Sequence, residues 1–330
     1  MRIFTHYSQA VDVLNDGGIV AIPTETVYGL AGIATHQDAV LKIFAAKNRP
    51  FLDPLIVHIP RSWLSISELT RRGVIAGDLL AAEDYILVSE FLKTSMPGPL
   101  SLLLPKGRKI PDIVTSGSNL VAIRSPEHEV AQELLESLQL PLAAPSANLF
   151  GKISPTSLQH VEAGLQGKID FVLDGGHCKN GIESTIVRIN NSKLIIYRKG
   201  SFDIYQVANK FSEVLGPSKG EVTPGSQISH YAPDKPVLRW TDGDAFGQHD
   251  FLIVLTSEFS NPFIKLKFPG RVICLTSDYQ PMDAARNLFS ALHSLNLNAE
   301  CNRIFYLDRR PSGFIWDAII DRLSRASGNG

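Results

Sequence analysis

The chain has 330 residues, of which 44% are apolar and 20% are charged, and this balance excludes disordered and fibrous proteins. At this length two domains are expected, the first of them the larger. The formal net charge of −1 argues against a protein that holds nucleic acid by overall charge, although a local basic groove stays compatible with it.

The predicted elements of the first two thirds of the chain alternate between helices and strands. Apolar spacing predicts helices over 8–16, 38–46, 127–138, from Thr156 onward and over 203–215, with one long helical region over 65–92. Buried-strand patterns cover 19–22, 55–59, 100–104, 120–124, 142–145, 171–173, 184–189 and 194–197. Several of the later strands follow each other without a helix, which predicts an α/β domain with a twisted mixed sheet over residues 1–215.

A Pro/Gly/Ser-rich stretch then predicts a linker over residues 216–236. Beyond it, strands are expected over 251–255, 272–275 and 304–307, with helices over 282–295 and 315–326. We expect residues 237–330 to form a small Rossmann-like, three-layer β/α domain.

The cysteines and the N-terminus bear on the compartment. Cys178, Cys274 and Cys301 form no CxxC pair, so neither a disulfide framework nor a zinc knuckle is expected. The N-terminal residues lack a signal-peptide core, and no segment reaches the roughly 20 apolar residues that span a bilayer. We therefore expect a cytoplasmic protein without a membrane partner.

One loop is unusually rich in chemistry. The run Ile22-Pro-Thr-Glu-Thr-Val-Tyr-Gly-Leu30 places hydroxyls, a carboxylate and a phenol directly after a strand, and Lys47-Asn-Arg-Pro50 and Pro54-Leu-Ile-Val-His58 follow it. Such a loop is typical of a site for a small polar ligand beside a phosphate. The usual glycine-rich phosphate loops, the GxSxG elbow and metal-ligand spacings are missing, so we expect no dedicated metal site.

Separate side chains could replace a standard phosphate loop, and each has a second interpretation. Lys47 and Arg49 bind phosphate or compensate the dipole at the end of a helix. Ser146 and Asn148 contact a ligand or only shape a turn. The remaining candidates are likewise open: Ser154 as contact or helix cap, Arg124 and Arg198 as anion ligands or solvated strand ends, and His58 as catalyst or core histidine.

Taken together, these motifs resemble a known family. The series formed by Pro23-Thr-Glu-Thr-Val-Tyr-Gly-Leu30, Lys47-Asn-Arg-Pro50, Pro54-Leu-Ile-Val-His58, Met96-Pro-Gly-Pro-Leu100, Val121-Ala-Ile-Arg124, Ala144-Pro-Ser-Ala-Asn148 and Ser184-Thr-Ile-Val187 resembles the YrdC-type domain of threonylcarbamoyl-AMP synthases. The linker ending in His230-Tyr-Ala-Pro233, with a further small domain, is similar to the long two-domain form of that family.

The resemblance implies that L-threonine, bicarbonate and ATP, with Mg²⁺ on the phosphates, give threonylcarbamoyl-adenylate and pyrophosphate. A downstream transferase would then modify the adenosine beside the tRNA anticodon; tRNA binding by this chain itself is possible but not required. By position, Lys47 and Arg49 match the catalytic, triphosphate-binding cations. Further nucleotide contacts match Ser146, Asn148, Ser154, Arg198 and Tyr231, and the threonine pocket matches Thr24, His58, Arg124 and Ser184.

Two departures from the family pattern stand out. Leu120 occupies the position of a threonine that contacts the nucleotide, so that hydrogen bond is expected to be lost or replaced. The resemblance implies that the linker over 216–236 covers the active site as a lid. In this linker, Gln227 and Ser229 replace basic or aromatic residues, which predicts weaker contacts between the lid and the triphosphate.

Two other functions fit parts of the sequence. An RNA-binding or ribosome-associated module of the same fold would use a basic cleft for phosphodiesters, but the chain lacks interleaved aromatic and basic residues. A carbamoyl-transfer relative would carry zinc-finger segments, and this chain has no CxxC element.

Overall fold

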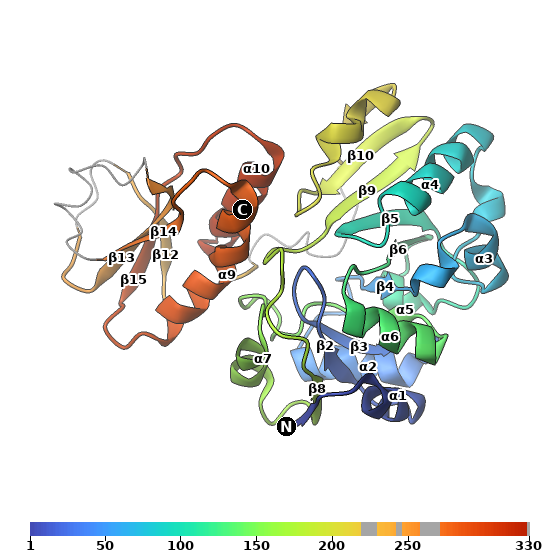
Figure 1. Cartoon of the computed structure of the whole chain (residues 1–330), viewed down its shortest axis with the longest axis horizontal. Coiled ribbons are helices and arrows are strands. Elements are labelled where there is room, and N and C mark those ends of the chain that lie inside the picture. The colour runs from blue at the N-terminus through green and yellow to red at the C-terminus, as the bar shows by residue number, and fades with distance from the viewer. Residues whose placement is uncertain (219–229, 242–245, 258–270, 329–330) are drawn as a thin grey trace.

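The computed structural model describes residues 1–218, 230–241, 246–257 and 271–328, and its two sheets divide the chain into two units (Figure 1). We call residues 1–218 the N-terminal unit and residues 230–328 the C-terminal unit. The predicted linker over 216–236 lies largely in 219–229, outside the described residues, so the predicted domain limits at 215 and 236 stay predictions.

The N-terminal unit is built on one eleven-stranded mixed sheet. In sheet order the strands are β1 (Arg2–Phe4), β8 (Phe171–Leu173), β2 (Val20–Ile22), β3 (Gly29–Ile33), β7 (Leu142–Ala143), β4 (Ile56–His58), β6 (Leu120–Arg124), β5 (Leu100–Pro105), β9 (Thr185–Asn190), β10 (Lys193–Arg198) and β11 (Glu213–Leu215). Parallel and antiparallel pairs alternate irregularly along the sheet, which confirms the predicted mixed α/β fold.

Helices cover both faces of this sheet. They are α1 (Tyr7–Asn15), α2 (Gln37–Lys47), α3 (Ile66–Arg71), α4 (Ala82–Thr94), α5 (Asp112–Thr115), α6 (Glu129–Leu138) and α7 (Leu158–Leu165), with short 3₁₀ turns η1 (Arg61–Trp63), η2 (Gly77–Leu79) and η3 (Ile204–Lys210). Helices α1 and α6 share one apolar cluster with β2, β3 and β7, whereas α2 contributes to the larger cluster on the other face.

Two helix predictions need correction. The region over 65–92 is not one helix, because α3 ends before two tight glycine positions. Gly73 has a φ of +74°, and a Cβ on Gly77 would lie 2.5 Å from the side chains of Ile66 and Thr70. The sequence pattern missed these breaks because both lie inside an apolar stretch.

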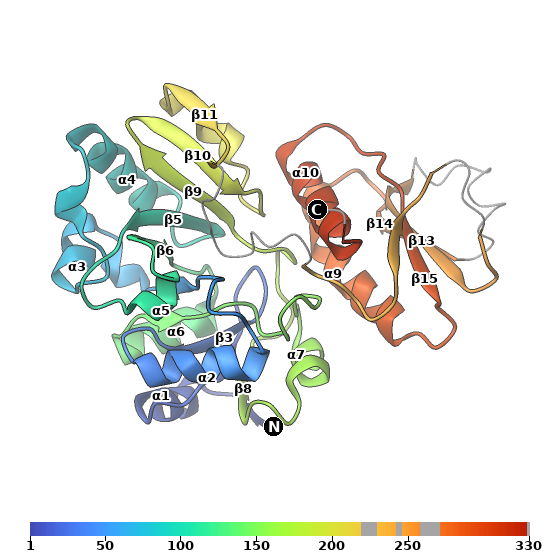
Figure 2. The same cartoon turned by 180° about the vertical axis from the view of Figure 1, so that it is seen from behind.

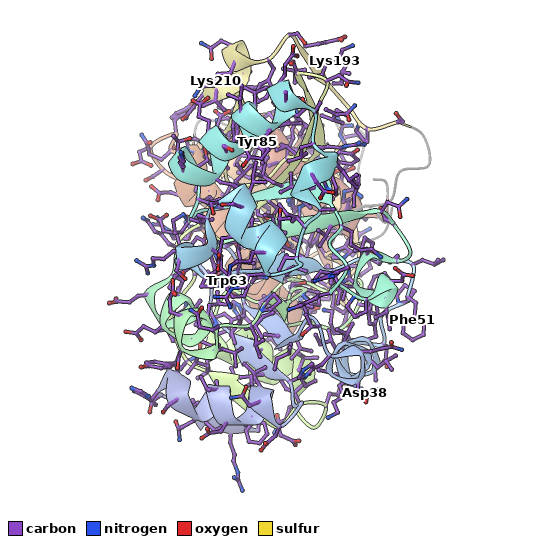
Figure 3. The ribbon with its side chains drawn as sticks, turned by 90° about the vertical axis from the view of Figure 1, so that its right-hand side faces the viewer. Asp38, Phe51, Trp63, Tyr85, Lys193 and Lys210 are labelled. Atoms are coloured by element: carbon purple, nitrogen blue, oxygen red, sulfur yellow. The ribbon has the colours of Figure 1, made fainter. Side chains whose placement is uncertain are left out.

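The helix predicted over 203–215 is also wrong in its second half. Only η3 is helical there, and the chain then forms β11, which pairs in parallel with β10. The ion pair between Lys193 and Glu213, at 2.8 Å, joins these two strands, and Lys210 pairs with Glu90. Figure 3 shows Lys193 and Lys210 at the same end of the molecule. Pairing to a distant strand overrides the local preference.

The C-terminal unit is a four-stranded parallel sheet with two described helices. Its strands, in sheet order, are β12 (Val237–Arg239), β15 (Arg303–Tyr306), β13 (Asp250–Thr256) and β14 (Val272–Thr276), and its helices are α9 (Pro281–Leu297) and α10 (Phe314–Ala326). Both helices lie on the face turned toward the N-terminal unit (Figures 1 and 2). A third layer is not seen among the described residues; an apolar cluster around Trp240 and Phe305 lines the opposite face.

The two units are packed closely against each other. One apolar cluster runs through both and includes Ile153 of the N-terminal unit and Phe289 of α9. Gly181, with a φ of +76°, approaches so near that a Cβ would lie 2.3 Å from the backbone of Arg286. Only glycine fits such an approach, so this contact fixes where α9 meets the N-terminal unit.

Candidate active site

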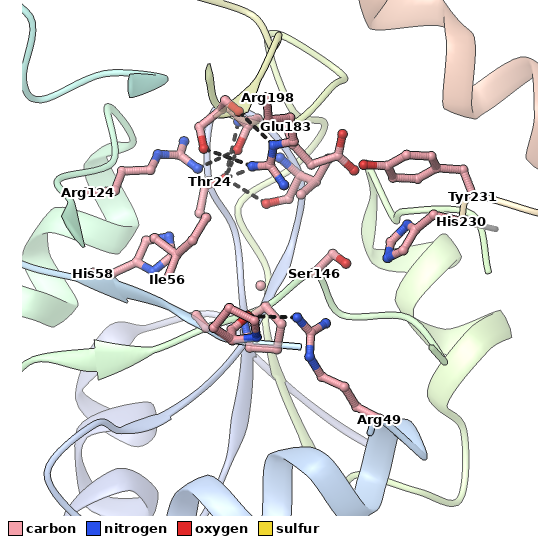
Figure 4. A pocket seen from close by; sticks show the side chains of 17 residues that line it. Thr24, Arg49, Ile56, His58, Arg124, Ser146, Glu183, Arg198, His230 and Tyr231 are labelled. Carbon is pink, nitrogen blue, oxygen red and sulfur yellow. Dashed lines mark hydrogen bonds between the residues drawn. The ribbon is translucent and has the colours of Figure 1, made fainter. Parts of the chain in front are cut away.

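A cavity opens where strand ends of the large sheet meet His230 and Tyr231, the first described residues of the C-terminal unit. Figure 4 shows Arg124 and His58 on one side, and Tyr231 and His230 on the opposite side. The lining residues are Thr24, Thr26, Val27, Gly29, Arg49, Pro54, Ile56, His58, Arg124, Ala144, Pro145, Ser146, Glu183, Ser184, Arg198, His230 and Tyr231.

The loop between β2 and β3 forms part of the cavity wall. Thr24 closes its turn: the Oγ1 hydroxyl donates to the Val27 carbonyl at 2.6 Å and accepts the backbone N–H of Thr26 and Val27, each at 3.2 Å. Tyr28 donates its hydroxyl to the Gly176 carbonyl at 2.8 Å and anchors the loop from behind. The hydroxyl of Thr24 therefore has a structural role as well as a place in the cavity.

Arg124 ends β6 and is held by three groups of the N-terminal unit. Its Nη2 lies 2.8 Å from Oε1 of Glu25, its Nη1 donates to Oγ1 of Thr26 at 2.8 Å, and its Nε donates to the Gly98 carbonyl at 3.3 Å. The side chains of Arg124 and Glu25 are only 4% and 2% exposed. The guanidinium is thus a fixed, buried cation. Glu25 already occupies Nη2 of this guanidinium, so a ligand carboxylate that forms a paired hydrogen bond with Arg124 has to share the guanidinium with Glu25.

His58 stands beside Arg124, because the two residues are register partners in β4 and β6. Burial and the neighbouring Arg124 lower the pKa of His58 to about 3. The imidazole is therefore neutral at physiological pH, and its Nδ1 has no hydrogen-bond partner among the described residues. A neutral ring here offers a ligand a donor or an acceptor without adding charge.

Arg49 is fixed at the other end of the cavity. Its Nη2 lies 2.9 Å from Oδ2 of the buried Asp53 and donates to the Pro54 carbonyl at 2.8 Å. Burial is the main cause that lowers the pKa of Arg49, and Asp53 acts against it. The guanidinium nevertheless stays charged, because arginine does not deprotonate in proteins. Its position in the cavity fits the predicted phosphate contact.

Lys47 and Asn148 do not line the cavity. The buried Nζ of Lys47 donates to the carbonyls of Ser146 and Asn148, the latter at 2.5 Å. The Asn148 side-chain amide donates to the carbonyls of Leu149 and Lys152, each at 2.8 Å. Both residues brace the loop that presents Ser146 to the cavity, so the structure gives them an indirect place in the site.

A second polar group lies around Glu183. Ser154, which does not line the cavity, donates its hydroxyl to Oε1 of Glu183 at 2.6 Å. Arg198 donates to the carbonyl and to the hydroxyl of Ser184, at 3.0 and 3.1 Å, and Ser184 also bonds to Ser101. The structure therefore couples Ser184 to Arg198; its predicted place in a threonine pocket stays a prediction.

Tyr231 closes the cavity on the side of the C-terminal unit. It is 1% exposed, has a φ of +66° and packs against Phe289 at 5.4 Å between ring centroids. Burial raises the pKa of Tyr231 to about 12, so the phenol keeps its proton. Tyr231 therefore lines the cavity, and its predicted contact with the nucleotide stays a prediction. Gln227 and Ser229 lie outside the described residues.

Leu120 lies away from the cavity. It begins β6, four residues before Arg124, which is about 13 Å along a strand. Leu120 packs against a small apolar cluster that contains Ile56 and Leu103. Ile56 itself lines the cavity, so Leu120 adjoins the cavity wall through this neighbour, and the expected loss of a nucleotide hydrogen bond stays a prediction.

Thr26, Glu25 and Glu183 carry more of the site than the sequence analysis assigned to them. Thr26 and Glu25 lie inside the recognised loop, so their spacing could have marked them; Glu183 lies next to the recognised Ser184.

Within the described ranges, no three His, Cys, Asp or Glu side chains gather as a metal site. The same residues include no helix with the length and apolarity to cross a bilayer.

Two protein-family models match this chain. The family model Sua5_yciO_yrdC, described as "Telomere recombination", matches residues 12–200, which is more than half of the chain. The chain belongs to the Sua5/YciO/YrdC family. A second model, described as "Threonylcarbamoyl-AMP synthase, C-terminal domain", matches residues 199–328. The resemblance seen in the sequence motifs is thereby confirmed, including that of the second domain.

Individual relatives in this family agree with that placement. The threonylcarbamoyl-AMP synthase of Pyrococcus abyssi is 38% identical over 69% of this chain and 66% of its own length. That of Bacillus subtilis is 39% identical over 70% of this chain and 65% of its own length. These matches thus span slightly less than two thirds of either curated relative.

A solved structure extends the likeness to the whole fold. The crystal structure of P. abyssi Sua5 complexed with L-threonine superposes with a TM-score of 0.80 at 30% identity, covering 100% of this chain and 98% of that one. The large mixed sheet and the small parallel sheet therefore both belong to an architecture already known in the Sua5/YciO/YrdC family.

Proposed function

We propose that this protein is a threonylcarbamoyl-AMP synthase. The observation that carries the proposal is the cavity itself, in which a fixed Arg124 beside neutral His58 faces a second set of cations, Arg49 and Arg198. One cation suits an amino-acid carboxylate and the other two suit phosphates. Membership of the Sua5/YciO/YrdC family and the matching C-terminal model support the same activity.

L-Threonine would lie against the wall formed by Arg124, Thr24 and His58. Arg124 would hold its carboxylate, with Glu25 keeping the guanidinium in place from behind. The neutral imidazole of His58 would add no positive charge beside the ammonium group of threonine, so the substrate could bind there, and the ammonium group would release its proton to solvent before the amine reacts. Thr26, whose hydroxyl accepts a hydrogen bond from Arg124, would help to orient the carboxylate.

The reaction would proceed through a carbamate. The amine of threonine and bicarbonate lose water and form an N–C bond, and an oxygen of the resulting carboxylate attacks the α-phosphorus of ATP. The new O–P bond forms as the bond to the β-phosphate oxygen breaks, and pyrophosphate leaves. Such a transfer needs positioning and charge stabilisation and no protein nucleophile, in keeping with the residues that line the cavity.

The triphosphate would be bound at Arg49 and Arg198, with Ser146 as a further contact. Lys47 and Asn148 would act by bracing the loop of Ser146, and Ser154 by holding Glu183. Mg²⁺ would enter with the phosphates of ATP, because it is usually held by substrate phosphates and water. Tyr231 would cover the nucleotide and keep water from the adenylate.

The product would be passed on. Threonylcarbamoyl-adenylate is a reactive mixed anhydride, so we infer a transferase that takes the group to the adenosine beside the tRNA anticodon.

We also propose a cytoplasmic, reducing setting, since Cys178, Cys274 and Cys301 are free thiols.

Pyrophosphate release tests the proposal. We expect release only when ATP, bicarbonate and L-threonine are all present, with L-serine and L-alanine as poor replacements for threonine. Equal release without threonine would rule out the substrate assignment.

A further inference from the structure

One cation of the C-terminal unit reaches into the wall of the cavity. Arg322 lies on α10 and is fully buried, although arginine is almost never buried unless it is paired. Its neighbours are groups of the N-terminal unit as well as groups of its own helix. The sequence motifs assigned no role to it.

The first partner of Arg322 is Glu183. The Nε atom lies 3.1 Å from Oε2 of Glu183, while Ser154 holds Oε1 from the other side at 2.6 Å. The carboxylate is therefore fixed at both oxygens and lines the cavity between them. One holder belongs to the N-terminal unit and the other to the C-terminal unit.

The second and third contacts of Arg322 reach two other parts of the cavity wall. Its Nη1 donates to the Lys199 carbonyl at 2.5 Å, directly after the cavity residue Arg198. Its guanidinium carbon lies 5.6 Å from the ring centroid of Tyr231, a cation–π distance. A single side chain thus touches Glu183, the end of β10 and the ring that closes the cavity.

The charges around Glu183 make this contact consequential. Besides Arg322 from α10, the groups that act on Glu183 or feel its charge are Arg198 from β10 and the pair His230 and Tyr231. Burial alone raises the pKa of Glu183, but Arg322, Arg198 and the Ser154 hydrogen bond together bring it below its ordinary value. The carboxylate thus stays ionised, and Arg322 is the largest of the causes that lower its pKa.

We propose that Arg322 is a positioning residue of the active site, supplied by the C-terminal unit to hold Glu183 as an oriented carboxylate and to fix the strand end that carries Arg198. The inference rests on the proposed function. It gives the C-terminal unit a definite task, which is to complete the electrostatics of the cavity. Arg322 itself does not line the cavity.

The test compares Arg322→Met with the wild-type protein in pyrophosphate release from pH 4 to 9. Without Arg322 the pKa of Glu183 rises, so the acid limb of the profile moves up by about one pH unit or more, and turnover at neutral pH falls at least about tenfold. The matched control is Asp317→Asn on the same helix, which removes the half-exposed pair with Lys199 and should leave the acid limb in place.

Two further variants keep the inference testable. Arg322→Lys retains the charge, so its acid limb should match that of the wild type even if turnover falls. Glu183→Gln should lower turnover at least about tenfold, since it removes the carboxylate that Arg322 positions. An unshifted acid limb in Arg322→Met, or full turnover in Glu183→Gln, overturns the inference.

A substrate-free readout separates this inference from the proposed function. In Arg322→Met, a buried Glu183 with a raised pKa is stable only while protonated, so the unfolding temperature should drop further as the pH rises. Adding Glu183→Gln should remove that extra drop. If the wild-type protein releases no pyrophosphate, the proposed function fails, and the unfolding comparison still decides the role of Arg322: identical pH dependence in the single and double variants refutes it.

Discussion

The two walls of the cavity differ in how they are held. The wall around Arg124 is built within the N-terminal unit, from Glu25, Thr26 and the Gly98 carbonyl. The opposite wall combines both units, because Glu183 bonds to Ser154 on one side and to Arg322 on the other. Tyr231, which closes that wall, packs on α9.

One wall of the cavity is formed within the N-terminal unit alone, whereas the other forms only when the two units are docked. A wall held by its own unit can keep its shape when the other unit is removed, whereas a shared wall depends on the docking of two units. We therefore expect the Arg124 wall, proposed to bind threonine, to keep its function when the C-terminal unit is changed, and the opposite wall, proposed to bind the nucleotide, to lose it. The following predictions test that asymmetry.

Substitution of Arg124 should have the largest effect. Arg124→Ala removes the proposed ligand of the threonine carboxylate and leaves Glu25 buried without its cation, so turnover should fall about 10²–10³-fold and the KM for threonine should rise. Steady-state pyrophosphate release measures both quantities. Arg124→Lys keeps a positive charge beside Glu25 but not the planar fork, so it should stay folded and still bind threonine poorly. Wild-type kinetics in either variant would refute the threonine wall.

Removal of the C-terminal unit should act on the other wall. A fragment that ends after residue 215 lacks Arg322 and Tyr231, so product formation should fall at least about tenfold. Calorimetry on the folded fragment should show threonine affinity close to that of the whole chain and a much weaker affinity for a non-hydrolysable ATP analogue. Equal losses for the two ligands would remove the asymmetry between the walls.

Substitution of Lys47 tests the hydrogen bonds that support the loop of Ser146, which is proposed to contact the nucleotide. Lys47→Ala leaves the carbonyls of Ser146 and Asn148 without their donor, which should lower the free energy of unfolding by about 1–3 kcal/mol and raise the KM for ATP. Chemical denaturation and kinetics measure the two effects. Lys42→Ala, on the exposed side of the same helix, is the control and should change neither. An ATP effect with unchanged stability would indicate direct phosphate contact instead.

The smallest effect expected is a pH dependence of stability at the contact between the two units. His160 of α7 stacks on His293 of α9 at 3.9 Å between ring centroids. Burial and the neighbouring His293 lower the pKa of His160 to about 3. The unfolded chain takes up this proton near pH 6.5 and the folded chain does not, so stability should be lost as the pH falls below about 6.5.

Thermal unfolding at pH 7.5 and pH 5.0 measures this loss, and His160→Gln should reduce it. His58 and His230 also have a pKa lowered to about 3 by burial, so part of the loss should persist in the variant. An unchanged pH dependence in His160→Gln would show that the stacked pair does not govern the joint.

The sequence predicted the fold where local pattern and tertiary pairing agree. Strand β4 and helix α6 follow from apolar spacing, and both were placed within a few residues. Strand β3 was missed because Gly29 and Gly32 disguise it, although close packing requires small residues there. Strand β11 was misread as helix because its partner β10 lies in another segment of the chain.

The motifs singled out residues that the structure brings together, while the role of each residue stays a prediction. Thr24, His58, Arg124 and Arg198 all line one cavity. Motif spacing did not separate residues that line the cavity from residues that brace it, such as Lys47. Arg322 could not be found from local pattern, since a charged residue on a helix usually faces water and its burial depends on how two units dock.

Product analysis with ¹³C-labelled bicarbonate tests the central proposal most directly. The wild-type protein, incubated with ATP, L-threonine and the label, should give an adenylate that contains threonine and one ¹³C atom, detected by mass spectrometry as a shift of about one mass unit. The account places threonine on the Arg124 wall with its carboxylate bound and its amine free, so carbon enters at nitrogen. An unlabelled threonyl-adenylate, formed through the carboxylate of threonine itself, would contradict it.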